Sequence, residues 1–123
     1  MQRISLMRTW IATASALVLA LATTAAGAHA FLDHASPLVG STVAAAPHEV
    51  TLSFTQSLEP SFSTVEVIGP KGARVDAGKA QISGNTMRVG VKAAGPGTYH
   101  VHWHALSVDT HKTQGSFTFH VGQ

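Results

Sequence analysis

The chain has 123 residues, with eight Lys or Arg against six Asp or Glu, eight histidines and no cysteine. The lack of cysteine excludes disulfides, thiolate metal sites and cysteine nucleophiles. No basic stripe or patch is present that could neutralise phosphates, which argues against nucleic acid as a partner.

The first 28 residues are typical of a secretory signal peptide. Arg3 and Arg8 supply the positive start, residues 11–22 are apolar, and Ala26-Gly27-Ala28 is a small-residue cleavage site. The apolar stretch is too short to favour a membrane-spanning helix. The sequence therefore predicts an exported protein whose mature part is formally neutral, with six basic and six acidic residues.

Cleavage after Ala28 would make His29 the first residue of a single mature domain, residues 29–123. Ala28-His29-Ala30 satisfies the same small-residue pattern, so cleavage after Ala30 is the alternative, and it would remove His29. The position of the cut decides whether the protein has a terminal histidine.

Alternation of apolar and polar residues in the mature chain predicts about seven short strands and no α-helix. Glycine- and proline-rich turns separate the strands. The clearest strands lie, in chain order, at residues 50–54, 65–67 with Phe62 near the start, 80–82, 87–91, 98–106 and 115–121. Such a pattern favours an all-β fold, an immunoglobulin-like Greek-key sandwich or small barrel.

The strand at 98–106 is the strongest of these. Its alternation predicts one apolar face and one face of histidines, formed respectively by Tyr99, Val101 and Trp103 and by His100, His102 and His104. If this strand pairs with residues 115–121 as a hairpin, the connection at 107–114 carries Asp109 and His111 at one end of the sandwich. Loops held between core strands are good platforms for ligands.

Asp109 and His111 are two residues apart, so in an extended loop they can offer a carboxylate oxygen and an imidazole nitrogen to one ion. A terminal His29 would add its α-amine and its ring Nδ1. This nitrogen and oxygen donor set suits tetragonal Cu(II). The alternative is a surface turn in which Asp109 only caps backbone N–H groups.

The histidines of strand 98–106, with His120 outward on the last strand, are candidates for a second, exposed metal site. The alternative is a solvated sheet face. His34 and His48 have no evident partners and are expected at the surface.

The order and spacing of several motifs resemble the CopC family of periplasmic copper-binding proteins across essentially the whole mature chain. The motifs are His29-Ala30, Ser36-Pro37, Gly40-Ser41, Pro47, Val50-x-Leu52-x-Phe54, Leu58-Glu59-Pro60-Ser61-Phe62-Ser63, Gly97-Thr98-Tyr99-x-Val101-x-Trp103, Ser107-x-Asp109-x-His111 and Gly115-Ser116-Phe117-x-Phe119-x-Val121.

The resemblance implies a Greek-key fold of seven to nine strands that binds one Cu(II) through the N-terminal amine, His29, Asp109 and His111. It also implies a start at His29, a periplasmic location, and a role as a monomeric copper carrier or buffer in copper homeostasis or resistance. The partner implied is an inner-membrane copper transporter of the CopD type.

Two features depart from the family. Family members usually have glycine between the Asp and the His, and Thr110 is not expected to enter backbone regions reserved for glycine. The mature chain has Met87 as its one methionine, so a methionine-rich Cu(I) site is not expected.

Two other functions remain open on the sequence. A terminal histidine brace on an immunoglobulin-like fold is also the copper site of oxidative polysaccharide monooxygenases, but this chain is small and Asp109 would fill an equatorial position that such enzymes need. A metal-free structural sandwich would bind no copper tightly. The sequence has no catalytic serine arrangement, phosphate loop or acid/base carboxylate pair, and a non-enzymatic copper protein is the favoured reading.

Overall fold

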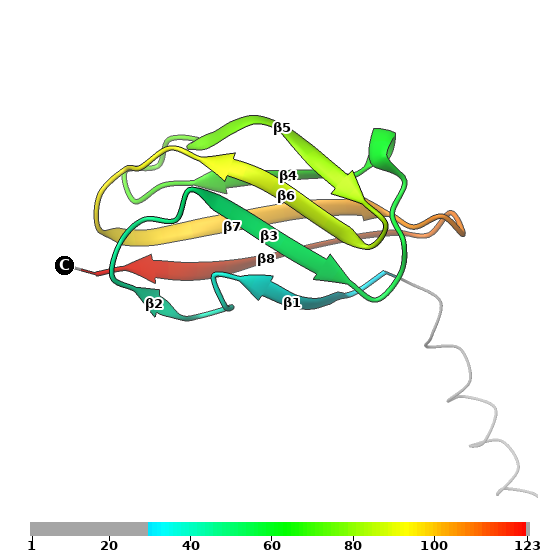
Figure 1. Cartoon of the computed structure of the whole chain (residues 1–123), viewed down its shortest axis with the longest axis horizontal. Coiled ribbons are helices and arrows are strands. Elements are labelled where there is room, and N and C mark those ends of the chain that lie inside the picture. The colour runs from blue at the N-terminus through cyan, green and yellow to red at the C-terminus, as the bar shows by residue number, and fades with distance from the viewer. Residues whose placement is uncertain (1–29, 123) are drawn as a thin grey trace, which may run out of the picture.

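Two four-stranded sheets lie face to face in the computed structural model, which describes residues 30–122 (Figure 1). The strands are β1 (Leu32–Ser36), β2 (Thr42–Val43), β3 (Glu49–Phe54), β4 (Thr64–Ile68), β5 (Asp76–Ser83), β6 (Thr86–Val91), β7 (Gly97–Leu106) and β8 (Lys112–Val121). One sheet has the order β1-β3-β6-β5 and the other β2-β8-β7-β4. β2 pairs parallel with β8, and the other pairings are antiparallel. The predicted all-β class and the strand number are confirmed.

Apolar side chains from both sheets fill the space between them. On β3, Val50, Leu52 and Phe54 are buried and alternate with partly or fully exposed residues. On β7 the buried side chains include Tyr99 and Trp103, and Trp103 packs edge-on against Phe54 with ring centroids 4.9 Å apart. Each such buried side chain contributes about 1.5–3 kcal/mol. The core predicted from the alternation, including Trp103 as a core residue, is confirmed.

The hairpin of β7 and β8 is confirmed, but its second strand begins earlier than predicted. β8 starts at Lys112 and not at Gly115, because Leu106 pairs with Lys112 and His104 with Gln114. These first residues of β8 have polar side chains, so alternation of apolar residues could not reveal them. The connection is therefore a tight turn of residues 107–111, which leaves Asp109 and His111 little conformational freedom.

Phe62 was expected near the start of a strand and is instead the last residue of a 3₁₀ helix, η2 (Pro60–Phe62). Its side chain is 67% exposed. Pro60 favours the helical turn because its ring fixes φ and it has no N–H to contribute to a sheet. The interval before β4 therefore belongs to a loop that lies over the end of β7, where the Glu59 N–H donates to the carbonyl of Leu106 at 2.8 Å.

The chain enters the domain at the same end as the β7–β8 turn. Figure 1 shows the start of the described chain and this turn on one side of the sandwich, with the C-terminal end of β8 on the other. A hydrogen bond joins the start of the described chain to β8 just after the turn, from Oγ1 of Thr113 to the carbonyl of Ala30 at 2.7 Å. Within residues 30–122, no helix is long and apolar enough to cross a membrane.

Candidate metal centre

Asp109 and His111 lie next to one another in the β7–β8 turn. Nδ1 of His111 is 3.4 Å from Oδ1 of Asp109, and the two side chains are 45% and 42% exposed. Two donors on adjacent corners of a square around a first-row divalent ion lie about 2.9 Å apart, given metal–donor distances of about 2.0–2.1 Å. Small side-chain movements would therefore bring both groups onto one ion, and solvent can reach them.

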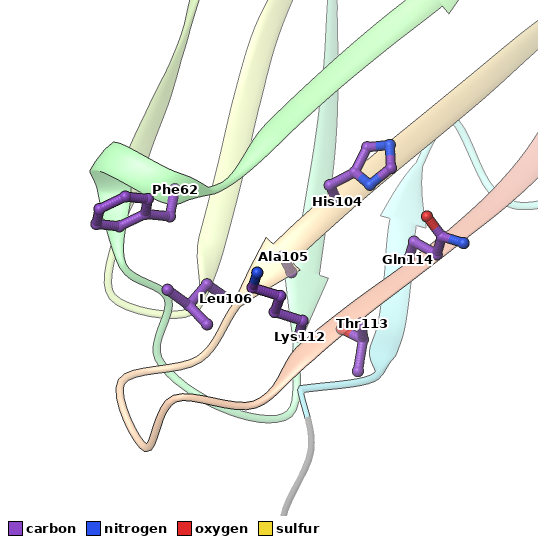
Figure 2. Close-up of a pocket in the computed structure, with 7 residues that line it drawn as sticks. All are labelled: Phe62, His104, Ala105, Leu106, Lys112, Thr113 and Gln114. Atoms are coloured by element: carbon purple, nitrogen blue, oxygen red, sulfur yellow. The ribbon is translucent and has the colours of Figure 1, made fainter.

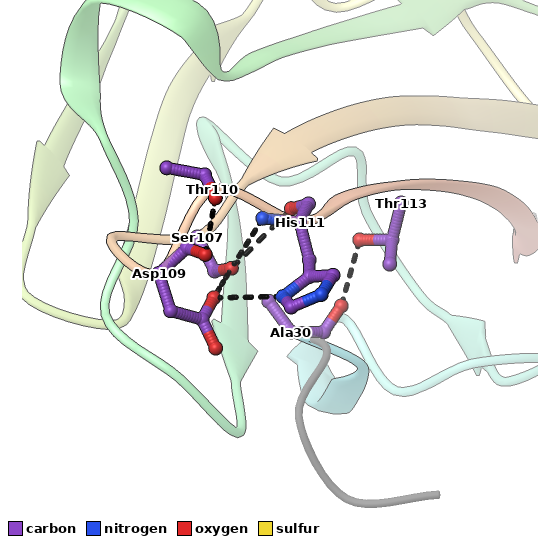
Figure 3. A network of polar contacts seen from close by, with 6 residues as sticks. All are labelled: Ala30, Ser107, Asp109, Thr110, His111 and Thr113. Carbon is purple, nitrogen blue, oxygen red and sulfur yellow. Dashed lines mark hydrogen bonds and ion pairs between the residues drawn. The ribbon is translucent and has the colours of Figure 1, made fainter. Parts of the chain in front are cut away.

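Ser107 hydrogen-bonds both the Asp109 carboxylate and the backbone of His111 (Figure 3). Its side chain is fully buried, and its Oγ donates a hydrogen bond to Oδ1 of Asp109. The same oxygen accepts from the N–H of His111 at 3.3 Å, and the Ser107 N–H donates to the His111 carbonyl at 3.0 Å. One buried hydroxyl group thus connects the carboxylate to the backbone of the histidine.

This arrangement favours the ionised form of the carboxylate. The hydrogen bond from Ser107 is the largest cause that lowers the pKa of Asp109 below its ordinary value; burial opposes it, and the hydrogen bond and charge of the neighbouring His111 lower the pKa further. A carboxylate that is already deprotonated at neutral pH can accept a cation without first releasing a proton.

Thr110 adopts the backbone conformation that its side chain was expected to exclude. Its φ is +73°, in the left-handed region, so the expectation that Thr110 could not replace glycine there is wrong. Two local contacts compensate part of the cost: its N–H donates to the Ser107 carbonyl at 2.8 Å, and its Oγ1 donates to the Asp109 carbonyl. A β-branched residue in this region is costly, by about 1–3 kcal/mol.

The start of the described chain lies against the turn. Ala30 is fully buried, and its carbonyl accepts the hydrogen bond from Thr113, two residues after His111. In Figure 3 the His111 ring lies between the Asp109 carboxylate and Ala30. His29 and the proposed signal peptide lie outside the described residues, so the amine and imidazole expected from His29 remain predictions.

The four-histidine cluster, one of the two alternatives for the sheet face, is not formed. His100, His102 and His104 are exposed on β7 as expected, but their partners across β8 are Thr118, Ser116 and Gln114. His120 instead lies opposite Thr98, with its Nδ1 2.9 Å from the threonine hydroxyl. Among residues 30–122, no three His, Asp or Glu side chains gather closely enough to hold an ion together. The register of the hairpin, which could not be predicted from the sequence, separates His120 from the three histidines of β7.

The other predicted surface histidines are exposed. His34 is paired with the neighbouring Asp33 at 3.0 Å, and His48 lies just before β3. Two residues that position the candidate site were missed, Ser107 and Thr113. Ser107 is part of the Ser-x-Asp-x-His pattern, but nothing in the sequence says that its hydroxyl is buried. The partner of Thr113 is 83 positions away in the chain.

Comparison with known proteins places this geometry in context. The sequence-family model of the CopC domain matches residues 32–122 of this chain. Copper resistance protein C of Xanthomonas campestris pv. juglandis is 38% identical over 121 residues, covering 90% of this chain and 94% of that protein. Copper transport protein CutJ of Bacillus subtilis is 32% identical over 100 residues, which cover 78% of this chain and 18% of CutJ.

Solved structures agree with the sequence comparison. The crystal structure of CopC from Methylosinus trichosporium OB3b superposes with a TM-score of 0.70 at 30% identity, over 76% of this chain and 93% of that one. The family-model match, residues 32–122, extends over both sheets and the β7–β8 turn that carries Asp109 and His111. The chain therefore belongs to the CopC family, a family of copper-binding proteins with members in copper resistance and copper transport.

Proposed function

We propose that this protein is a periplasmic carrier or buffer for Cu(II). Removal of residues 1–28 as a signal peptide would leave a mature domain, residues 29–123, that begins with His29. One Cu(II) would then be bound by the terminal amine and ring of His29, by Asp109 and by His111. Two imidazoles, an amine and a carboxylate suit tetragonal Cu(II) better than the softer Cu(I).

The observation that carries this proposal is the position of Ala30 relative to the turn. Ala30 is fully buried, and its carbonyl is hydrogen-bonded to Thr113 in β8, the strand that begins directly after His111. The residue before Ala30 is joined to it by a single peptide bond, and consecutive Cα atoms are about 3.8 Å apart. Residue 29 is therefore within one residue's length of a segment bonded to β8 beside the turn, which supports cleavage after Ala28 over cleavage after Ala30.

The same geometry supports binding without catalysis. Asp109 would fill an equatorial position around the metal, whereas a copper monooxygenase needs a position open to its substrate. Solvent reaches both side chains, which are nearly half exposed, so an ion could pass from this turn to another protein without unfolding of the domain. The partial match to CutJ, a much longer copper transport protein, supports delivery to a membrane transporter of the CopD type.

Cu(II) titration of the exported protein tests the proposal. The wild type is expected to take up one tight equivalent. Asp109→Ala and His111→Ala should each weaken that binding by more than the roughly 100-fold that loss of an outer-shell group can cost, with an unchanged circular dichroism spectrum because neither side chain is in the core. The matched control is His48→Ala, which removes an exposed histidine far from the turn.

Three results would contradict the proposal. A wild type without a tight equivalent would support a metal-free structural sandwich. Tight binding that survives both turn substitutions would place the copper at another site. Reductant-driven oxidation of a polysaccharide by the copper-loaded protein would instead identify the protein as a monooxygenase.

A further inference from the structure

The outer face of the sheet β2-β8-β7-β4 carries a row of imidazoles that copper binding in the turn does not use. His100, His102 and His104 are all exposed, and they alternate with the buried side chains of β7. The row lies on the outer face of the sheet, whereas Asp109 and His111 lie in the turn beyond the ends of β7 and β8.

Neighbouring histidines in this row have the spacing of a two-imidazole chelate. Side chains two apart on a strand point to the same face, and their Cα atoms are about 6.6 Å apart. Two imidazoles that lean toward one another from this distance can place a nitrogen each about 2.0–2.1 Å from one ion between them. The spacing alone would allow either His100 with His102 or His102 with His104.

The shape of the surface selects the second pair. His102 and His104 together line two hollows, one of about 330 Å³ toward β8 and one of about 310 Å³ toward β4. His100 lines neither of them. The hollow toward β8 is edged by Gln114 and Ser116, which are neutral and can hydrogen-bond water. Figure 2 shows the His104 ring and the Gln114 amide standing on neighbouring strands.

The surrounding charges explain why the pair has no third protein donor. Glu66 lies directly opposite His102 on β4, but its carboxylate is 3.5 Å from Nη1 of Arg74. Arg74 also binds Asp76 at 2.7 Å, which holds the guanidinium in the hollow toward β4. The positive charge of Arg74 would repel a cation bound at the histidines. Because Arg74 is paired with Glu66, the Glu66 carboxylate does not help to bind that cation.

We propose that His102 and His104 form a second, open site for a borderline divalent cation, Cu(II) or Zn(II), with water in the remaining positions. Cu(II) is preferred over Zn(II), as for nitrogen donors in general. The site is weaker than the one proposed in the turn because it has two protein donors, so in a Cu(II) titration of the wild type it fills second. It is independent of the site in the turn.

A titration of the full mature protein beyond one equivalent of Cu(II), in competition with a chromogenic chelator, tests this site. The wild type is expected to bind a second, weaker equivalent. His102→Gln with His104→Gln should abolish the second equivalent and leave the first unchanged. His34→Gln with His48→Gln removes the same number of exposed histidines and should leave both equivalents. Zn(II) alone, followed by NMR of the imidazole signals, should perturb His102 and His104 and spare His100.

Removal of the opposing charge gives an independent test. Arg74→Gln frees Glu66 and removes a positive charge, so the second equivalent should bind roughly six- to tenfold tighter, the effect of a unit charge about 6–8 Å from a divalent ion in water. The site is refuted if the wild type binds no second ion, if the second ion persists without His102 and His104, or if Arg74→Gln fails to tighten it. Failure of the first equivalent alone would refute the site in the turn and leave this one standing.

Discussion

Thr113→Val isolates the hydrogen bond that holds Ala30, the first residue that the structure describes. Valine has nearly the shape of threonine but no hydroxyl, so the change removes the 2.7 Å hydrogen bond to the carbonyl of Ala30 and little else. Ala30 is fully buried, and water cannot easily replace the lost donor. Leaving a buried acceptor without its partner costs about 1–3 kcal/mol. We expect the free energy of unfolding to fall by about this amount.

The same substitution should weaken copper binding. If the hydrogen bond holds His29 beside the turn, its loss adds an ordering cost to binding, and 1–2 kcal/mol corresponds to a loss of affinity of about 5- to 30-fold. Competition with a Cu(II) chelator measures the affinity, and chemical denaturation of the copper-free protein measures the stability. Thr118→Val makes the same exchange on β8 at a half-buried position away from Ala30, and it should change neither quantity by more than about 0.5 kcal/mol.

A Thr113→Val protein with lower stability but unchanged copper affinity would contradict the expected link between the anchored Ala30 and copper binding. Such a result would mean that Ala30 is anchored for folding alone and that residue 29 takes no part in binding the ion. An unchanged stability would show that the hydroxyl does not serve the buried carbonyl at all.

Three further predictions concern Ser107 and Thr110 in the turn and the ion pair of Asp76 with Arg74. Ser107→Ala removes the donor that lowers the pKa of Asp109, and chelator competition should show about tenfold weaker Cu(II) binding. Thr110→Gly removes the steric cost of the positive φ and should raise the free energy of unfolding by up to about 1 kcal/mol, after the entropy cost of glycine. The control Thr110→Ala should give no gain. A lower stability with glycine would contradict the left-handed backbone at this position. Burial acts to raise the pKa of Asp76, but hydrogen bonds from Arg74 and the Val67 N–H outweigh it, so the pKa is lowered and the ionised form stabilises the fold. Asp76→Asn should therefore cost stability at pH 5–8, with a deficit that shrinks as the pH falls below about 4, and denaturation curves showing a constant deficit down to pH 2 would contradict this.

The fold could be predicted where apolar residues alternate and could not where they are sparse. β3 and β7 present regular buried sets, and both were located closely. β1 has one buried side chain, that of Ala35, and its pairing with β3 is irregular between Leu32 and His34. β2 has two residues and is stabilised by its parallel pairing with β8. Both strands depend on partners distant in sequence, so local alternation cannot detect them.

The residues of the candidate site could also be predicted only in part. Asp109 and His111 were recognisable because their side chains carry metal-binding chemistry at a short spacing. Ser107 and Thr113 were not, because a hydroxyl gains its role only from burial and from a partner that the fold brings to it. The conformation of Thr110 was predicted wrongly because the hydrogen bonds of the turn outweigh the steric preference of a β-branched residue.

The most direct test of the central claim is electron paramagnetic resonance of the Cu(II) protein in two forms, one starting at His29 and one with a single glycine added before it. In the first form the amine and both imidazoles are expected to give coupling to three nitrogens. The added residue should remove the amine from the copper, change the spectrum, and lower the affinity by more than the effect expected for Ser107→Ala. Identical spectra and affinities for the two forms would show that the terminal amine is not a ligand and would contradict the proposed site.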